Sequence, residues 1–296
     1  MRKRVRKKIL VTGARGMLGC HLVPRLRACG HEVVELSRAG QSSVRADLTD
    51  TEQGRAVLDE VSPEIIVNLA ALTDVDECER DPQRAYLTNV RIVENLANWI
   101  RKHGSCSHLV QISTDQVYDG IGSHKEEEIT LTNYYGFSKY ASELAAAAVP
   151  STILRTNFFG PSQCPGRASL SDWLVRSLSG GESITVFDDV CFSPLSLQKL
   201  VEQLELVIGN PQLGVFNLGS RDGMSKADFA FTLAAVLDLP TETMRRGSSS
   251  NGKLTAYRPK DMRMDSSSYE GAFGIQLPSL REEIHSMRAG YVNKTR

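Results

Sequence analysis

Short apolar runs alternate with segments of helical periodicity from the beginning of the chain. The runs predict strands over residues 7–13, 31–38, 64–71, 108–115 and 151–160. Strands that are apolar throughout are typical of a parallel sheet covered by helices on both faces. The intervening segments predict those helices, over residues 17–30, 51–61, 85–104 and 138–149. The first half of the chain therefore indicates an α/β protein with a Rossmann-like, doubly wound parallel sheet.

The second half has a looser pattern, which predicts helices over 171–181, 195–210 and 225–239, strands over 182–189 and 214–220, and a flexible loop over 244–253. We predict a dinucleotide-binding domain over 8–157, to which 183–220 returns in part, and a smaller, interleaved C-terminal substrate-binding lobe over 158–182 and 221–287. A basic leader (1–7) and a tail (288–296) are predicted to be flexible. The cleft between domain and lobe is the expected site.

The composition narrows the class of protein. The chain has 296 residues, zero formal net charge and six cysteines. The basic start, MRKRVRKK, lacks the apolar segment of a secretory signal, and the balanced charge does not favour nucleic-acid binding. No stretch approaches the roughly 20 apolar residues that cross a bilayer. Because the cysteines form no Cys-x-x-Cys pair and the histidines have no ligand spacing, we expect a cytoplasmic protein with reduced thiols and no metal.

A glycine-rich turn follows the first predicted strand. The stretch ILVTGARGMLG places Gly13, Gly16 and Gly19 between that strand and the first helix. Glycines there let the backbone approach a diphosphate, and the helix N-terminus favours negative charge. The spacing is G-x-x-G-x-x-G rather than G-x-G-x-x-G, and such turns also serve as plain connectors. The strand before it and the helix after it favour a nucleotide site.

The end of the second predicted strand bears on the choice between NADP and NAD. An NAD site commonly has an acidic residue there, whereas this strand ends in ELSRAG, with Arg38 near the position and Arg15 in the glycine turn. Two guanidinium groups can clamp a 2′-phosphate, so NADP(H) is favoured over NAD. Both arginines could instead be solvated surface residues. The nearby carboxylate of Glu35 would favour NAD. Asp47 is a candidate for the adenine amine or for a helix cap.

The stretch TNYYGFSKYASE contains a candidate acid–base pair. Tyr135 has a lysine four residues later, Lys139, and residues at that spacing share one face of a helix. A phenol has a pKa of about 10, and a nearby ammonium lowers it by stabilising the phenolate. A hydroxyl at the end of the strand HLVQISTD could hydrogen-bond a substrate carbonyl; we favour Thr114, with Ser113 second, and expect Asp115 to act in a turn or cap.

With these motifs in order, the chain resembles the extended short-chain dehydrogenase/reductases. Further stretches are similar to one branch, the dTDP-4-dehydrorhamnose reductase family, and the likeness runs from about residue 8 to 287. These stretches are NLAALTDVDECE (68–79), ISTDQVYDG (112–120), NYYGFSKYASE (133–143), LRTNFFG (154–160) and YRPKDMRMD (257–265).

The resemblance implies roles for particular residues. In that family a threonine, a tyrosine and a lysine form the catalytic group, which matches Thr114, Tyr135 and Lys139. The tyrosine and the lysine would also contact the cofactor. Its other contacts would fall on Gly13, Arg15, Gly16, Met17, Leu18, Arg38, Asp47, Leu48, Ala70, Ala71 and Thr73. The implied reaction is hydride transfer from NAD(P)H to C4 of a 4-keto-6-deoxyhexose on a nucleotide diphosphate, with the tyrosine protonating the oxygen, as in dTDP-rhamnose biosynthesis.

The departures from the family pattern concern the substrate side. Gln116 replaces an aromatic residue, Leu131 a proline and Phe158 a tryptophan. We take Gln116, Phe158 and Arg258 as candidate substrate-binding residues beside Thr114 and Tyr135. For the diphosphate we also consider Arg155 and the loop around Lys253, each of which could be structural. The run EEE (126–128) is expected to be a solvated loop, although some relatives use glutamates to bind magnesium.

Alternative functions remain open at this point. The same cofactor could serve an epimerase or a reductase of another nucleotide sugar. The chain also resembles the beta subunit of methionine adenosyltransferase, which implies a non-catalytic, NADP-binding regulatory subunit as an alternative. The expected partner is a nucleotide-sugar substrate, without nucleic acid or membrane. A homodimer is compatible with the sequence, which does not specify the oligomeric state.

Overall fold

The computed structural model describes residues 5–38, 43–103, 107–251 and 254–292. It divides into two compact units. The first comprises Met1–Thr114, Asn133–Leu154 and Val201–Phe216, and the second comprises Asp115–Thr132, Arg155–Leu200 and Asn217–Arg296. Within the described residues, no helix has both the length and the apolar character that a membrane span requires.

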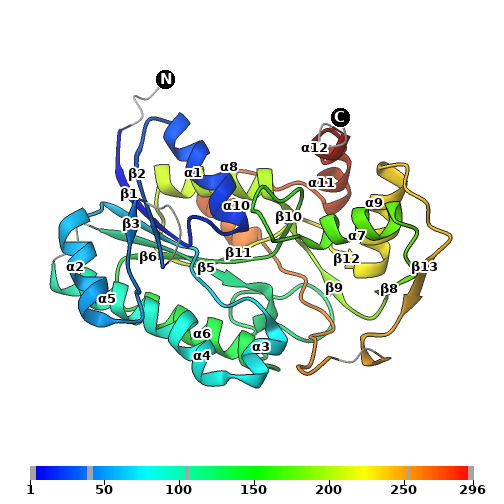
Figure 1. Cartoon of the computed structure of the whole chain (residues 1–296), viewed down its shortest axis with the longest axis horizontal. Coiled ribbons are helices and arrows are strands. Elements are labelled where there is room, and N and C mark those ends of the chain that lie inside the picture. The colour runs from blue at the N-terminus through cyan, green and yellow to red at the C-terminus, as the bar shows by residue number, and fades with distance from the viewer. Residues whose placement is uncertain (1–4, 39–42, 104–106, 252–253, 293–296) are drawn as a thin grey trace. The chain divides into compact units, whose positions relative to one another are not determined.

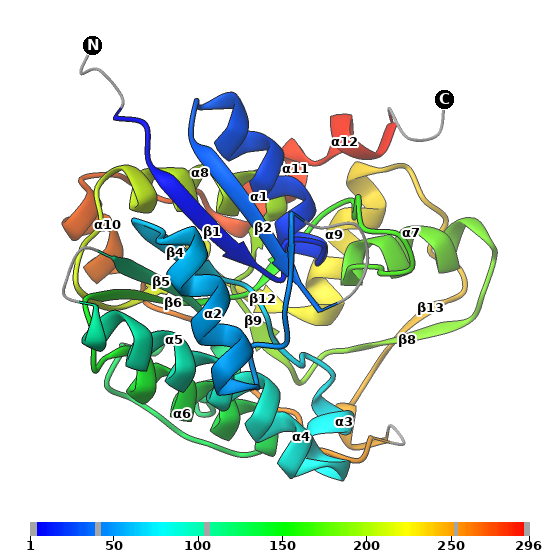
Figure 2. The ribbon, with the colours of Figure 1, turned by 60° about the vertical axis from the view of Figure 1, so that its left-hand side comes forward.

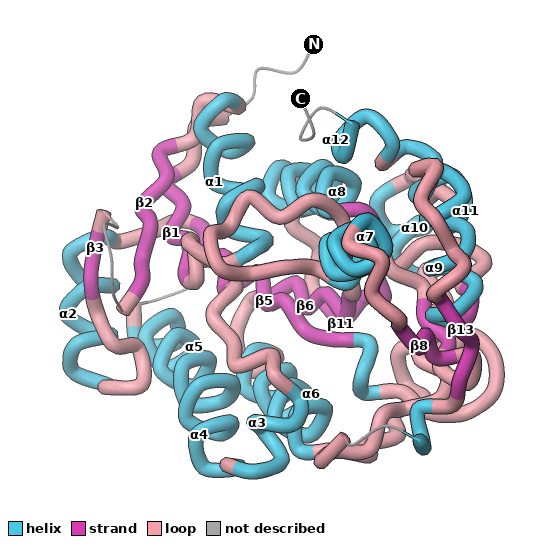
Figure 3. The backbone as a smooth tube through the Cα atoms, turned by 45° about the vertical axis from the view of Figure 1, so that its right-hand side comes forward, coloured by secondary structure: helices cyan, strands magenta, loops and turns pink. Residues whose placement is uncertain are grey.

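The first unit is built on a seven-stranded sheet, in which β1 pairs in parallel with β2 and β4, and β4 with β5. Figure 3 shows the strands side by side. In sheet order they are β11 (Gly214–Leu218), β6 (Ser151–Thr156), β5 (His108–Thr114), β4 (Ile65–Asn68), β1 (Lys8–Thr12), β2 (Glu32–Ser37) and β3 (Val44–Arg45). This is the order of a doubly wound sheet, with the switch point beside β1. The predicted fold class is confirmed.

Helices cover both faces of this sheet (Figure 1). On one face lie α1 (Met17–Ala28) and α8 (Leu197–Gly209), joined by an ion pair of 2.6 Å between Arg25 Nε and Glu205 Oε2. On the other lie α2 (Thr51–Val61), α3 (Val75–Arg80), α4 (Pro82–Tyr86), the π-helix η1 (Leu87–Arg91), α5 (Ile92–Lys102) and α6 (Tyr134–Ala146). Because the sheet is covered on both faces, all residues of β4 and all of β1 except Lys8 are buried.

The helix that carries the candidate acid–base pair begins earlier than its apolar pattern predicts. α6 begins at Tyr134, whereas the pattern predicts a start at Ser138. The side chain of Asn133 accepts a hydrogen bond of 2.8 Å from Gly136 N and so caps the helix. The cap places Tyr135 within the first turn.

The second unit packs around an aromatic core. Phe229 meets Phe159 and Phe192 edge to face, with ring centroids 4.9 and 5.4 Å away. Figure 2 shows its longest strands, β8 (Ile184–Phe187) and β13 (Met244–Gly247), running together, and these pair in parallel. The shorter strands are β7 (Phe158–Phe159) with β10 (Leu195–Ser196) and β9 (Cys191–Phe192) with β12 (Met224–Ser225). The helices are α7 (Leu170–Ser179), α9 (Lys226–Val236), α10 (Ser267–Phe273), α11 (Leu280–Ser286), α12 (Arg288–Val292), and the 3₁₀ turns η2 (Asp115–Val117) and η3 (Ser249–Asn251).

Some local predictions for the second half of the chain need correction. Met244–Gly247 forms β13 instead of opening a flexible loop, because β8 supplies its hydrogen-bond partners. Within the predicted tail, α12 forms, and the hydroxyl of the buried Tyr291 donates to Ser171 Oγ at 2.8 Å. The second unit also contains residues 115–132, 155–157, 183–200 and 217–220, which we predicted to belong to the dinucleotide-binding part.

The close packing of α1 gives a first test. A Cβ on Gly19 would lie 2.5 Å from the carbonyl carbon of Ala14, whereas a Cβ on Gly54 in α2 would meet Leu48 Cδ2 at an ordinary 3.6 Å. We expect Gly19→Ala to lower the free energy of unfolding by about 1–3 kcal/mol, because the glycine turn must shift. Gly54→Ala should raise it by about 1 kcal/mol, because alanine favours the helix. Urea denaturation measures both, and equal effects would contradict this packing.

Candidate active site

A buried row of polar side chains crosses the carboxyl edge of the sheet. Thr12 on β1, Asn68 on β4 and Gln111 on β5 are paired in register. Thr12 Oγ1 donates to Asn68 Oδ1 at 2.5 Å, and Asn68 Nδ2 donates to Gln111 Oε1 at 2.8 Å. Sequence analysis missed this row. The signal was present, since each of the three residues interrupts an apolar run near its end.

The glycine turn lies beside this row. Gly13 has φ +60°, and a Cβ there would lie 2.8 Å from Ala70 N, so the position favours glycine for both reasons. Ala70 N in turn donates to Thr12 Oγ1 at 3.2 Å. Gly16 is the N-cap residue of α1 and offers no side chain to the N–H groups of the first turn. Such a helix start is suited to a phosphate group.

The predicted cofactor residues divide into buried and accessible groups. Leu18 and Leu48 are buried, so only their backbones could face a ligand. Gly16, Met17, Ala70 and Ala71 are half-buried, and Arg15, Arg38 and Thr73 are exposed. Arg38 directly follows β2, and Tyr135 and Lys139 lie on α6; the others occupy the glycine turn, the start of α1 and the segments that follow β3 and β4.

Two acidic residues near the predicted ribose site have partners of their own. Glu35 Oε1 forms an ion pair of 2.7 Å with Arg27 Nη2. Asp47 Oδ1 accepts hydrogen bonds from the backbone N and the hydroxyl of Thr49, at 2.9 and 2.8 Å. The helix-cap alternative for Asp47 is wrong, because the N-cap of α2 is Asp50. Its contact with adenine stays a prediction.

The π-helix connects the loop after β4 to the helix with the tyrosine. Asn89 is buried in η1, and its Oδ1 accepts from Leu72 N at 2.7 Å. Its Nδ2 donates to Ser138 Oγ at 2.8 Å, next to Lys139. Local π-helical turns frequently occur at functional sites. Sequence analysis did not identify Asn89, because nothing local distinguishes it from a surface asparagine.

Lys139 is the most informative of the predicted catalytic residues. Its side chain is 3% exposed, and its Nζ donates a hydrogen bond of 2.6 Å to the carbonyl oxygen of Ile112 on β5. Thr114 ends the same strand two residues later, and Tyr135 lies one turn before Lys139 on α6. All three are buried. The structure therefore brings the helix with the tyrosine and lysine against the strand that ends in the threonine.

Burial changes the acidity of this lysine. Removal from water lowers the pKa of Lys139 to about 8, while attraction to Glu143 opposes the change. Lys139 thus remains largely an ammonium at pH 7. The hydroxyl of Ser113 donates to the carboxylate of Glu143. Ser113 is therefore engaged with Glu143, and the choice of Thr114 as the hydroxyl for a substrate carbonyl stays a prediction.

The second unit holds the predicted substrate-side residues. Gln116 lies in η2 and Phe158 in β7, and both are half-buried. Arg258 donates to the carbonyl of Ala256 at 2.9 Å. Asp115 Oδ2 accepts from Asn157 Nδ2 at 2.6 Å, in agreement with a structural role. Lys253 lies outside the described residues.

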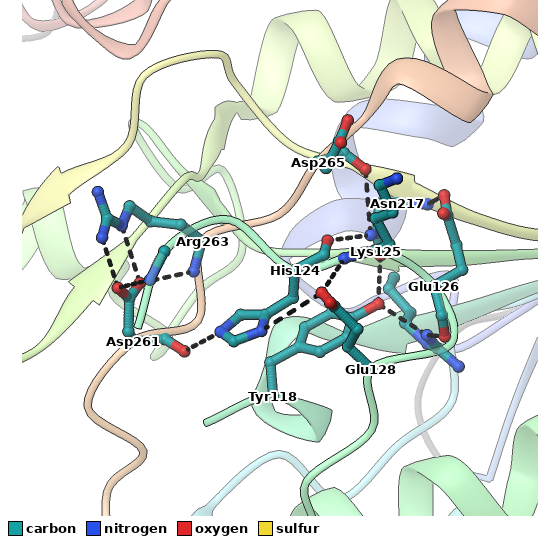
Figure 4. Close-up of polar contacts among 11 residues, drawn as sticks. Tyr118, His124, Lys125, Glu126, Glu128, Asn217, Asp261, Arg263 and Asp265 are labelled. Atoms are coloured by element: carbon teal, nitrogen blue, oxygen red, sulfur yellow. Dashed lines mark hydrogen bonds and ion pairs between the residues drawn. The ribbon is translucent and has the colours of Figure 1, made fainter. Parts of the chain in front are cut away.

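Arg155 proves to be structural. It is 2% exposed, and its Nη1 donates to Tyr118 Oη at 2.7 Å and to the Glu126 carbonyl at 2.5 Å. Figure 4 shows the Tyr118 ring beside His124, with its hydroxyl pointing toward Asn217. Glu126 also accepts from Asn217 N at 2.9 Å, so this part of the EEE run is not a solvated loop. As a diphosphate ligand, Arg155 is therefore excluded by its buried contacts.

No group of three histidine, cysteine, aspartate or glutamate side chains within the described part of the chain is placed to hold a metal ion.

A doubly wound sheet, a glycine turn after its first strand and a Tyr-x-x-x-Lys helix packed on β5 are together the features of the extended short-chain dehydrogenase/reductases, and this is the class to which the fold and the candidate site correspond. The family model described as the RmlD substrate binding domain matches residues 7–292, and the chain belongs to that family. The family predicted from the sequence motifs is confirmed.

Individual proteins that are similar to this chain agree with this family assignment. The probable low-salt glycan biosynthesis reductase Agl14 of Haloferax volcanii is 28% identical, over 95% of this chain and 97% of its own. A dTDP-4-dehydrorhamnose reductase of Streptomyces griseus is 30% identical, over 90% of this chain and 88% of its own. The crystal structure of a dTDP-4-dehydrorhamnose reductase from Bacillus anthracis in complex with NADP has a TM-score of 0.85 at 24% identity, over 98% of this chain and 100% of that one. This last likeness establishes the fold.

The environment of Lys139 can be tested without substrate. We expect its ammonium to titrate near pH 8 in the ligand-free protein, well below the ordinary lysine value of 10.5, because burial disfavours the charge. The measurement is a pH titration of ¹³C-labelled lysine side chains by NMR, with Lys139→Met to assign the signal. A midpoint above 10 would show that the side chain is solvated.

Proposed function

We propose that this protein uses NADPH to reduce the C4 ketone of a nucleotide-activated 4-keto-6-deoxyhexose, with dTDP-4-dehydrorhamnose as the favoured substrate. The observation that carries the proposal is the buried Lys139, hydrogen-bonded at 2.6 Å to Ile112 O beside the end of β5. Relatives over most of the chain are named reductases, one of dTDP-4-dehydrorhamnose and one of glycan biosynthesis. The reaction class is therefore better supported than the particular sugar.

The mechanism assigns one task to each of three residues. Bound NADPH supplies the hydride. Tyr135 donates its phenolic proton to the ketone oxygen, and the Lys139 ammonium stabilises the phenolate that remains. The Thr114 hydroxyl donates a hydrogen bond to the same oxygen and orients the carbonyl.

The choice of NADPH over NADH is based on the charges near the predicted ribose site. Arg15 and Arg38 are exposed, and Glu35 is paired with Arg27, so it does not offer the isolated carboxylate that NAD sites commonly use. The structurally similar reductase of Bacillus anthracis holds NADP. We propose that the two exposed arginines bind the 2′-phosphate.

A double variant tests this assignment. We expect Arg15→Ala with Arg38→Ala to weaken NADPH binding at least tenfold, because charge-assisted hydrogen bonds to the phosphate are lost, while NADH binding changes little. Fluorescence titration gives both dissociation constants. Arg55→Ala is the matched control, since Arg55 is an exposed arginine on α2 that pairs with Glu52. An unchanged ratio of the two constants in the double variant would refute the assignment.

A matched pair of tyrosine variants tests the proposed role of Tyr135 as the proton donor. We expect Tyr135→Phe to lower kcat by roughly 10²- to 10⁴-fold while NADPH still binds, because the proton donor is lost and the helix is kept. Tyr134→Phe makes the same chemical change at the preceding, exposed residue and should leave turnover within about twofold of wild type. Turnover is followed as loss of NADPH absorbance. Full activity of Tyr135→Phe would remove this residue from the mechanism.

A panel of nucleotide-linked 4-keto sugars identifies the substrate. We expect turnover with at least one 4-keto-6-deoxyhexose, and product analysis then gives the configuration at C4. Gln116, Phe158 and Arg258 are the proposed substrate-binding residues, and their substitution should change KM more than kcat. NADPH binding without turnover on any member would instead favour the non-catalytic regulatory subunit.

We also propose that the protein forms a homodimer through α6. Tyr134, Phe137 and Leu144 are 47, 56 and 60% exposed, and their spacing places them along one face of the helix. Leu144→Glu should shift the mass measured by light scattering toward the monomer. Leu213→Glu, at another exposed leucine, serves as the control. A wild-type protein that is monomeric at micromolar concentration would disprove the proposal.

A further inference from the structure

A second charged side chain is buried beside Lys139. Glu143 follows it by four residues on α6, so the two side chains lie on the same face of the helix. Glu143 is 2% exposed, which is unusual for a glutamate, because burial of a carboxylate is costly unless it is paired and hydrogen-bonded. The sequence motif Tyr-x-x-x-Lys does not include it, and the proposed mechanism assigns it no step.

Two consecutive residues of β5 bind this pair. The carbonyl of Ile112 accepts from Lys139 Nζ at 2.6 Å, and the hydroxyl of Ser113 donates to Glu143 Oε1. Thr114, the proposed partner of the substrate carbonyl, is the next residue. The ammonium and the carboxylate therefore attach α6 to β5 immediately before the proposed catalytic hydroxyl.

The charges around Lys139 indicate what the carboxylate does. From α3, the Cys78 thiol faces Lys139, but burial raises the pKa of this thiol to about 11, so it is uncharged at neutral pH. β5 contributes the neutral hydroxyls of Ser113 and Thr114, and η1 contributes the neutral amide of Asn89, bonded to Ser138. On α6 itself, Tyr135 carries its phenolic proton in the proposed mechanism and is then neutral. Glu143 is thus the anion that attracts the Lys139 ammonium at pH 7.

We propose that Glu143 is a positioning residue of the reductase: its buried carboxylate keeps Lys139 charged and, with Ser113, holds it against the end of β5 so that it can assist Tyr135. This inference rests on the proposed function, since it assigns a role within the same reaction. Its structural part, the coupling between Glu143 and Lys139, can be measured without substrate or cofactor.

The test compares three substitutions in the full-length chain. Glu143→Gln keeps the size of the side chain and an oxygen that accepts from Ser113, but removes the charge. We expect the alkaline limb of the profile of kcat against pH to move down by about one pH unit, with activity at pH 8 reduced about fivefold and KM little changed. In the ligand-free protein, the NMR titration midpoint of Lys139 should fall by the same amount.

The other two substitutions separate charge from structure. Glu143→Asp keeps the charge on a shorter side chain, so its midpoint and its alkaline limb should lie between those of wild type and Glu143→Gln. Ser113→Ala removes only the hydrogen bond and should lower kcat without lowering the Lys139 midpoint. Circular dichroism of each variant confirms that it is folded. If Glu143→Gln does not fold, the Asp variant decides the question, because the proposal requires a measurable downward shift there too.

Each outcome has a definite meaning. The proposal is overturned if Glu143→Gln changes neither the Lys139 titration midpoint nor the alkaline limb of kcat. If Glu143→Gln does not fold, the same result in Glu143→Asp overturns it. A midpoint that falls together with the limb would support it. If the wild-type protein reduces no keto sugar, the proposed function fails, whereas the NMR titration still shows whether Glu143 controls the charge of Lys139.

Discussion

Burial of the Lys139 ammonium at the end of β5 is the constraint on which the rest of the site depends. A buried charge is stable only where hydrogen bonds and an opposite charge replace water. The Ile112 carbonyl and Glu143 do so here, and both require α6 to lie against β5 in one register. Tyr135 belongs to the same helix and Thr114 to the same strand. Their placement therefore follows from the requirements of a single side chain.

The polar row formed by Thr12, Asn68 and Gln111 connects three neighbouring strands of the sheet by hydrogen bonds. Each side chain is buried and hydrogen-bonded, and Gln111 Nε2 lies 3.5 Å from Ser142 Oγ on α6. A slip of one strand would leave several buried polar groups without partners, so the row specifies the strand register. Because Ala70 N also bonds to Thr12 Oγ1, the row ties the glycine turn and the loop after β4 to the helix of the acid–base pair.

The second unit is stabilised by interactions of a different kind. Arg155 stacks over the Tyr118 ring at 5.4 Å and also bonds its hydroxyl, while Asn217 accepts from that hydroxyl. Arg155 therefore has a structural role, whereas the sequence analysis considered it as a ligand for the diphosphate. The departures from the family pattern, Gln116 and Phe158, fall in this unit. Membership of the family therefore defines the reaction more closely than it defines the sugar.

The sequence by itself determined the parallel sheet, the glycine turn and the Tyr135–Lys139 spacing, because periodicity and short spacings are local properties of the chain. Its apolar runs gave the long strands, and the family motifs pointed to Thr114. Tertiary structure alone decided that Ser113 binds Glu143, that Glu35 pairs with Arg27, that Arg155 is buried, and that Met244–Gly247 forms a strand. Each of these depends on a partner in another helix, strand or loop, and short strands and ion pairs carry no periodic signal of their own.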